Sequence, residues 1–157
     1  MLIYLDIDGV MVPANSWRKT ELLEDGFPAF SIRAVNALGR ILSVSGATIV
    51  LTTSHKSSYT LKEWENIFKR RNISVAKIKK LPKNSQLLNR KDELLRHFAT
   101  KKIPFHFIII DDDKSLNGLP PLLKDKLIQT SGSVGLTDEL ADKAIEIIEK
   151  SNYEIAP

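Results

Sequence analysis

Continuous apolar runs alternate with segments of helical periodicity along most of the chain. Short apolar runs are typical of strands buried on both faces of a sheet, and five segments have this character: residues 1–5, 47–51, 73–78, 105–110 and 126–129. Apolar positions repeat at helical spacing within 31–45, within 60–71, after Asn89 and after Thr137. This order predicts a three-layer α/β fold with a parallel sheet of about five strands.

Polar residues at the expected starts of three helices support these assignments. Thr60 and Glu63 are spaced as a capping box, in which each side chain accepts the other residue's backbone N–H. Asn89 and Thr137 are suitable N-caps for the helices that follow them.

Two segments interrupt the alternation. Residues 11–30 contain two prolines and no firm period, and they are too few for an independent domain. We therefore expect a flap there and no large cap domain. Residues 77–89 are rich in lysine and are expected to form a loop beyond the end of the third strand. Neither a repeat nor a second domain is evident, so residues 1–157 are expected to form one domain.

The composition excludes several classes of protein. Hydrophobic residues make up 43% of the 157 residues, as in ordinary globular proteins. No apolar run approaches the ~20 residues that span a bilayer. Cysteine is absent, which excludes disulfides and thiolate chemistry. The early acidic residues do not suit a signal peptide, so we expect a cytoplasmic protein without membrane contact. A net charge of +4 permits an acidic partner, such as a nucleic acid, without requiring one.

Residues that directly follow the strands carry the candidate chemistry, because ligands of open parallel sheets bind beyond the carboxyl ends of the strands. Asp6 and Asp8 follow the first strand, and Gly9 allows the chain to turn there. A carboxylate that attacks phosphorus needs a cation to reduce charge repulsion and an acid to protonate the leaving oxygen. The two aspartates fit these roles, although a solvated turn explains them better when they are taken alone.

Hydroxyl and basic residues come next in the chain. Thr52, Thr53 and Ser54 close the second strand, where a hydroxyl can bind a phosphoryl oxygen or simply cap the next helix. Arg90 and Lys91 begin a helix, where cations oppose the helix dipole. A bound anion explains this pair about as well as a surface cluster does.

Three adjacent acids, Asp111, Asp112 and Asp113, follow the very apolar fourth strand. Their mutual repulsion favours a bound cation, and hard oxygen ligands suit Mg²⁺. The three histidines are not spaced as a metal site. His106 is expected inside the fourth strand as a core residue, and His55 is expected in a surface loop, from which it could also reach a substrate.

In this order the residues resemble the four motifs of the haloacid dehalogenase (HAD) superfamily. Asp6-Ile7-Asp8-Gly9-Val10 is similar to the first motif and Thr52 to the second. Arg90 or Lys91 is similar to the third motif, and Asp111-Asp112 to the fourth. The four positions extend over nearly the whole chain.

The resemblance implies a Rossmann-like fold and a phosphatase mechanism. Asp6 would form an aspartyl-phosphate, and Asp8 would act as the acid/base. Mg²⁺ would be bound by Asp6, by the backbone carbonyl of Asp8, and by Asp111 and Asp112. Thr52 and the cation at Arg90 or Lys91 would complete the catalytic set.

More narrowly, the chain resembles the small HAD domains of RNA-repair "Swiss army knife" proteins. It carries their late Gly135-Leu136-Thr137, and Arg90-Lys91-Asp92-Glu93-Leu94 stands where they have Arg-Gly-x-Glu and a hydrophobic residue. It departs at His55-Lys56, where they have Trp-Arg. The resemblance implies a phosphorylated substrate, such as a nucleic-acid end, with Thr53, Ser54 and Lys56 as candidate substrate contacts.

Two other functions use a similar fold. A phospho-accepting receiver domain has an acidic pair after its first strand, but its phosphorylated aspartate follows the third strand. A non-catalytic binding module would not need both Asp6 and Asp8.

A border of positive charge is also expected around the strand ends. Its members would bind several phosphates of a polyanion, although a solvated lysine loop explains them equally well: Lys56, Lys77, Lys79, Lys80, Lys83, Arg90 and Lys91.

Overall fold

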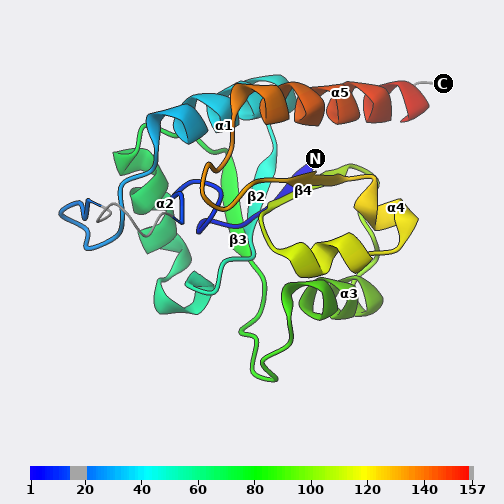
Figure 1. The fold of residues 1–157 in the computed structure, drawn as a ribbon, viewed down its shortest axis with the longest axis horizontal. Helices are drawn as coiled ribbons and strands as arrows, with labels where there is room; N and C mark the ends of the chain where they lie inside the picture. Colours follow the sequence, from blue (N-terminus) through cyan, green and yellow to red (C-terminus); the bar gives the residue numbers. More distant parts are fainter. Residues whose placement is uncertain (15–20, 156–157) are drawn as a thin grey trace.

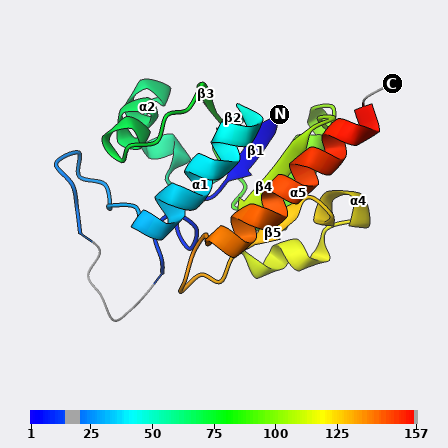
Figure 2. The same ribbon diagram turned by 90° about the horizontal axis from the view of Figure 1, so that it is seen from above.

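The structure, a computed structural model, describes residues 1–14 and 21–155. A five-stranded sheet lies at its centre, and all neighbouring strands are parallel, as predicted. The strands are β1 (Leu2–Leu5), β2 (Thr48–Leu51), β3 (Lys77–Lys80), β4 (Phe107–Asp111) and β5 (Leu127–Gln129). Figure 1 shows the sheet between the helices, and the strand order, β3-β2-β1-β4-β5, can be followed in Figure 2. Because receiver-like sheets are ordered 2-1-3-4-5, the observed order excludes a receiver topology.

Helices cover both faces of the sheet and make three layers. One face carries α1 (Ile32–Ser45), α2 (Leu61–Arg70) and α5 (Asp138–Ile155). The other carries α3 (Arg90–Thr100), the short α4 (Pro121–Lys124) and the 3₁₀ turn η2 (Lys114–Gly118). A second 3₁₀ turn, η1 (Lys56–Ser58), leads into α2. Helices α1 and α5 lie side by side across the sheet (Figure 2).

The core consists of two apolar clusters, one on each face of the sheet. Successive residues of a strand point to opposite faces, so Ile3 and Leu5 of β1 pack toward α1 and α5 while Tyr4 packs toward α3. All three side chains are at most 1% exposed. Burial on both faces explains why the central strands are continuous apolar runs. It also fixes β1 in the middle of the sheet, so the residue after it, Asp6, lies at the centre of the edge formed by the carboxyl ends of the strands.

The predicted helix caps are confirmed. Thr60 and Glu63 form the full capping box of α2. The Asn89 side chain accepts the Asp92 N–H at the start of α3, and Thr137 Oγ1 accepts the Leu140 N–H before α5. The cap at Asn89 fixes where α3 begins and hence where its first residue, Arg90, lies.

Two predicted strands were misplaced. The third strand was predicted at 73–78, but β3 spans Lys77–Lys80. As an edge strand it pairs only with β2, so Ile78 alone is buried and the lysines beside it need not be apolar. Ile73 is buried in the connection that precedes the strand.

The fourth strand was predicted at 105–110 and spans Phe107–Asp111. Phe105 is 81% exposed, and His106 is partly buried just outside the strand instead of in its interior. The lysine-rich loop was likewise predicted too long, because residues 77–80 belong to β3 and the loop runs from 81 to 89.

Residues 21–30, part of the expected flap, are fastened to α2. The Arg71 side chain is 2% exposed, and its Nη1 lies 2.7 Å from Asp25 Oδ2. Arg71 also donates to the carbonyls of Phe27 and Pro28, and its guanidinium lies over the Phe30 ring. Residues 15–20 of the same segment lie outside the described residues. In the described part of the chain, no helix is long and apolar enough to cross a membrane.

Candidate active site

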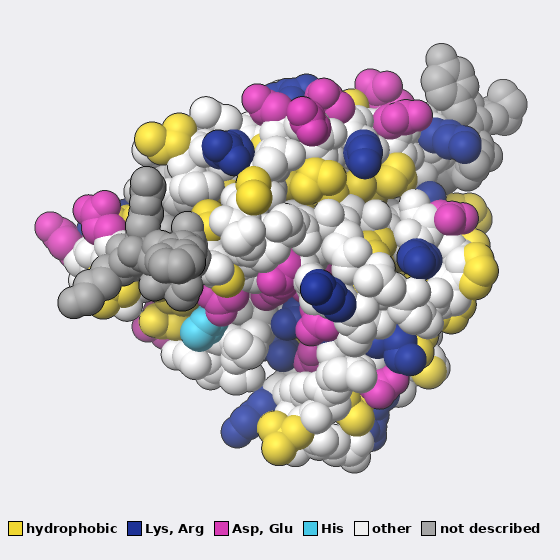
Figure 3. Space-filling view, viewed as in Figure 1, with side chains coloured by type: hydrophobic (Ala, Val, Ile, Leu, Met, Phe, Trp, Pro, Cys, Tyr) yellow, Lys and Arg dark blue, Asp and Glu magenta, His cyan; other side chains and the backbone are white. Residues whose placement is uncertain are grey.

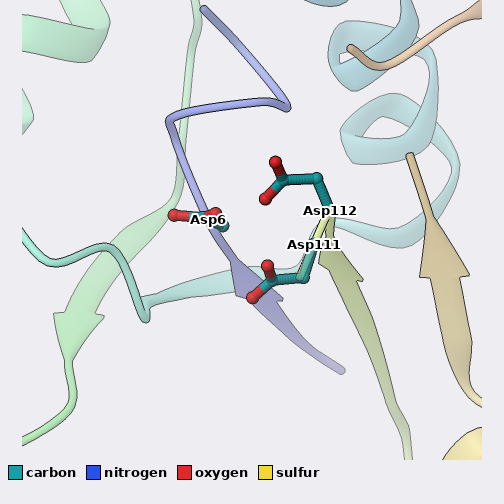
Figure 4. Close-up of side chains that lie close together, drawn as sticks. All are labelled: Asp6, Asp111 and Asp112. Carbon is teal, nitrogen blue, oxygen red and sulfur yellow. The ribbon is translucent and has the colours of Figure 1, made fainter. Parts of the chain in front are cut away.

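The carboxyl ends of β1 and β4 bring three aspartates together. Asp6 directly follows β1, Asp111 ends β4, and Asp112 follows it. Their carboxylates point toward one another (Figure 4), and one oxygen from each lies within 4.8 Å of the others. Asp6 and Asp111 are at most 5% exposed. The adjacency follows from the parallel pairing of β1 with β4, which aligns Leu5 with Ile110 and so places the next residues side by side.

Burial and mutual repulsion raise the pKa values of two of these acids. The pKa of Asp6 rises to about 9, first because burial disfavours its charged form and then because Asp111 lies beside it. Burial also raises the pKa of Asp111, while the positive charge of Arg90 opposes the shift. A site that keeps carboxyl groups this close needs a cation before they can all ionise near neutral pH.

The donor set fits Mg²⁺. All three groups offer hard oxygen ligands, which this ion prefers. Two glycines make room for Asp112: a Cβ on Gly9 would overlap its Oδ2, and a Cβ on Gly132 would lie 2.8 Å from the same atom. Gly9 also has φ +79°, a conformation that glycine adopts without strain. The ligands of such an ion would be Asp6, Asp111 and Asp112, together with backbone oxygen of the turn.

The loop after β5 closes the site from the other side. Thr130 Oγ1 donates to the Gly9 carbonyl over 2.7 Å, and the Leu136 N–H donates to the Val10 carbonyl. Thr130 and Gly132 were not predicted from the sequence. Both residues follow the last strand, so the criterion used for the other candidates, a position just beyond the carboxyl end of a strand, would have found them.

Among the residues that the structure describes, Arg90 is a basic residue that reaches the cluster. Its Nη1 donates to Thr52 Oγ1 at 2.8 Å and to Asp111 Oδ2 at 2.9 Å. Its Nη2 lies 3.8 Å from Asp6 Oδ1. The predicted Thr52 and Arg90 are therefore brought to the same acids. The Lys91 side chain points elsewhere and lies beside Gly118. The backbone N–H of Lys91 donates to Ser115 Oγ.

Lys56 does not lie on the rim where it was expected. It is 3% exposed, and its Nζ lies 2.9 Å from Glu93 Oε2. Glu93 Oε1 in turn lies 3.6 Å from Arg90 Nε. A buried row of alternating charges thus runs from Lys56 through Glu93 and Arg90 to Asp111. The lysine was expected to meet substrate because it follows the second strand, but its long side chain turns inward to the acid on α3.

The remaining predicted residues surround the cluster. Asp8 is half-exposed in the turn after β1, and its Oδ2 lies 2.7 Å from His55 Nε2. Thr53 is fully buried and its hydroxyl accepts the His55 N–H, while Ser54 is exposed. Asp113 lies outside the three-acid group, and its Oδ1 accepts the Ser115 N–H at the start of η2. Acidic and basic side chains meet near the middle of this face of the molecule (Figure 3).

The model of the family described as "HAD domain in Swiss Army Knife RNA repair proteins" matches residues 2–141. The matched range includes all five strands and every residue of the site. No curated protein matches the chain.

The metal assignment predicts a stability response to Mg²⁺. A ligand that binds only the folded state raises the melting temperature, so Mg²⁺ should stabilise the protein. Asp112→Asn should abolish most of that shift. Asp113→Asn is the matched control, because asparagine can keep the cap on η2, and it should respond like the wild type. Thermal unfolding with and without Mg²⁺ tests this, and an equal response in both variants would contradict the assignment.

The raised pKa of Asp6 predicts a dependence of stability on pH in the absence of metal. Between the ordinary carboxyl pKa and about 9, the folded state holds a proton that the unfolded state has lost. Stability should therefore fall as pH rises through this window, by up to about 1.4 kcal/mol per pH unit. Asp6→Asn removes the group, so its stability relative to wild type should increase from pH 5 to pH 8.

Urea unfolding in EDTA at several pH values measures this difference. Asp113→Asn should run parallel to the wild type. A constant offset between wild type and Asp6→Asn at every pH would show that Asp6 is not protonated in the folded protein.

Proposed function

Since the chain belongs to the family of HAD domains in Swiss Army Knife RNA repair proteins, we propose that it is a Mg²⁺-dependent phosphomonoester hydrolase that acts through an aspartyl-phosphate. The observation that carries the proposal is the position of Asp6. This carboxylate leaves the central strand of the sheet, beside two further acids and within 3.8 Å of Arg90. Nucleophile, metal ligands and counter-charge thus meet at one point.

In the first step, an Asp6 oxygen attacks the phosphorus of the substrate. A bond forms between this oxygen and phosphorus, and the bond from phosphorus to the leaving oxygen breaks. Asp8, on the next turn of the chain, supplies the proton that the leaving oxygen needs. When bound, Mg²⁺ reduces the repulsion between the carboxylates and the phosphoryl oxygens. The guanidinium of Arg90 adds a fixed positive charge beside Asp6 and Asp111.

In the second step, water cleaves the aspartyl-phosphate. Asp8, now ionised, takes a proton from the water as it attacks phosphorus. The bond from phosphorus to the Asp6 oxygen breaks, and inorganic phosphate is released. Two-step transfer through an enzyme carboxylate replaces one difficult displacement by two easier ones. The Thr52 hydroxyl, which accepts a hydrogen bond from Arg90, would hydrogen-bond a phosphoryl oxygen in both steps.

For the substrate we propose a nucleic-acid end. Lys79 and Lys83 are exposed on β3 and on the loop that leads from its carboxyl end to Arg90. Lys80 does not join them, because its ammonium donates to the carbonyls of Lys56 and Tyr59. The exposed lysines of this strand and loop would contact phosphates of a polyanion whose terminal phosphate reaches Asp6.

The mechanism predicts the effect of two substitutions on turnover. Asp6→Asn should abolish Mg²⁺-dependent release of phosphate from an aryl phosphate. Asp8→Asn should slow it by about 10²–10⁴-fold, the usual contribution of general acid catalysis. Asp113→Asn should keep wild-type activity. Steady-state kinetics with and without Mg²⁺ measure these effects, and full activity of a correctly folded Asp6→Asn protein would remove Asp6 as nucleophile.

The substrate proposal predicts a salt dependence. Affinity for a 5′- or 3′-phosphorylated oligonucleotide should fall steeply with ionic strength, because phosphate contacts release counterions. The double variant Lys79→Ala, Lys83→Ala should flatten this dependence by about two charges while sparing turnover of a small aryl phosphate. The control removes two exposed lysines of α5, Lys143 and Lys150. If both double variants behave alike, the lysines act only through net charge and a small phosphorylated metabolite becomes the better substrate.

A further inference from the structure

Asp8 has a partner that the proposed mechanism does not use. His55 Nε2 lies 2.7 Å from Asp8 Oδ2, although the two residues follow different strands. The side chains are 43% and 51% exposed, respectively, so both can be reached by a substrate. In proteins generally, an exposed ion pair of this kind contributes little to the free energy of folding. Because stability does not explain so short a contact with the proposed acid/base, a role of His55 in the reaction is the better explanation.

The histidine ring packs against a buried aromatic side chain. The Phe27 ring packs perpendicular to it, with 5.7 Å between the ring centroids. Phe27 is 3% exposed, and its own carbonyl accepts a hydrogen bond from the buried Arg71. Arg71 is paired with Asp25, so residues 25–27 form a rigid support behind the ring.

The backbone around His55 is fixed as well. Its N–H donates to Thr53 Oγ1 over 3.3 Å. The carbonyl of the next residue, Lys56, accepts from Trp64 Nε1 at 3.2 Å and from Lys80 Nζ at 3.1 Å. Because Trp64 is fully buried, the turn that carries His55 is anchored in the core. The ring therefore extends from a fixed backbone position, and its Nε2 meets Asp8 Oδ2.

We propose that His55 is a positioning residue for Asp8; the inference rests on the proposed phosphatase function. With the proton on Nε2, His55 donates to Oδ2 and leaves Oδ1 to carry the acidic proton. In the first step this proton passes from Oδ1 to the leaving oxygen, which also takes the electron pair of the broken bond to phosphorus. The carboxylate that results keeps the hydrogen bond from Nε2. His55 thereby selects the oxygen and the direction of proton transfer.

The test compares leaving groups that differ in their need for a proton. Phenyl phosphate releases a basic oxygen and depends on the acid, whereas 2,4-dinitrophenyl phosphate releases a stable anion. His55→Phe keeps a ring against Phe27 but removes the donor. It should lower kcat/KM on phenyl phosphate, which reports the first step without the later cleavage of the aspartyl-phosphate, by about 10–100-fold, part of the full acid contribution. On the dinitrophenyl ester the loss should stay below about threefold on the same basis.

Two further variants separate positioning from packing. His55→Gln offers an amide N–H at a reach similar to that of Nε2 and should recover most of the phenyl phosphate activity. In an Asp8→Asn background, His55→Phe should have no further effect. Equal losses on both esters, or no rescue by glutamine, would overturn the inference.

A measurement without turnover keeps this test apart from that of the phosphatase function. The side-chain carboxyl ¹³C NMR signal of Asp8 in the metal-free protein should move in His55→Phe and stay near its wild-type position in His55→Gln. Cooperative unfolding of both variants checks that they fold. If the wild type hydrolyses neither ester, the proposed function fails, while an unmoved Asp8 signal in His55→Phe would by itself overturn the role of His55.

Discussion

Repulsion among three carboxylates is the constraint around which this end of the sheet is built. Asp6 and Asp111 are buried where β1 and β4 run side by side, and Asp112 completes the group. Burial and proximity push the pKa of Asp6 to about 9. Such an arrangement is unfavourable unless a positive charge compensates it. Arg90 supplies one such charge inside the protein, and the oxygen-rich group itself suits a divalent cation.

The charges that compensate this repulsion extend from the three acids into the interior of the protein. Arg90 stands at the first position of α3 because Asn89 caps that helix, and Glu93 and Lys56 continue the row of alternating charges into the interior. Each ion pair offsets part of the cost of burying its neighbour. The row links the second strand end, α3 and the fourth strand end, so the helix cannot shift without disturbing the acids.

Small residues and aromatic rings shape the remaining walls of the site. Gly9 and Gly132 let two turns approach Asp112, and Thr130 ties the last strand end to the first. On the opposite side Phe27 and Trp64 support the turn that carries His55. These contacts are rigid packing and buried hydrogen bonds. They hold Asp8 and His55 at a defined distance, although both side chains are half-exposed.

The amino-acid sequence by itself determined the fold class and the order of the candidate chemistry. Double burial makes central strands such as β1 and β4 continuously apolar, so the acids that end them are visible without a structure. The sequence did not locate β3. This strand lies at the edge of the sheet, so the positions that its lysines occupy need not be apolar.

Only the tertiary structure decided which neighbours of a motif enter the site. Arg90 and Lys91 are adjacent in sequence, but successive residues of a helix point about 100° apart, and only Arg90 reaches the acids. Lys56 turns inward because Glu93 of α3 lies beside it. Thr130, Gly132 and the contact of Asp8 with His55 join segments that are distant along the chain. The pattern of apolar and polar residues along the chain indicates burial and periodicity. It does not indicate these pairings, because they form only when parallel strands bring their carboxyl ends to one edge of the sheet.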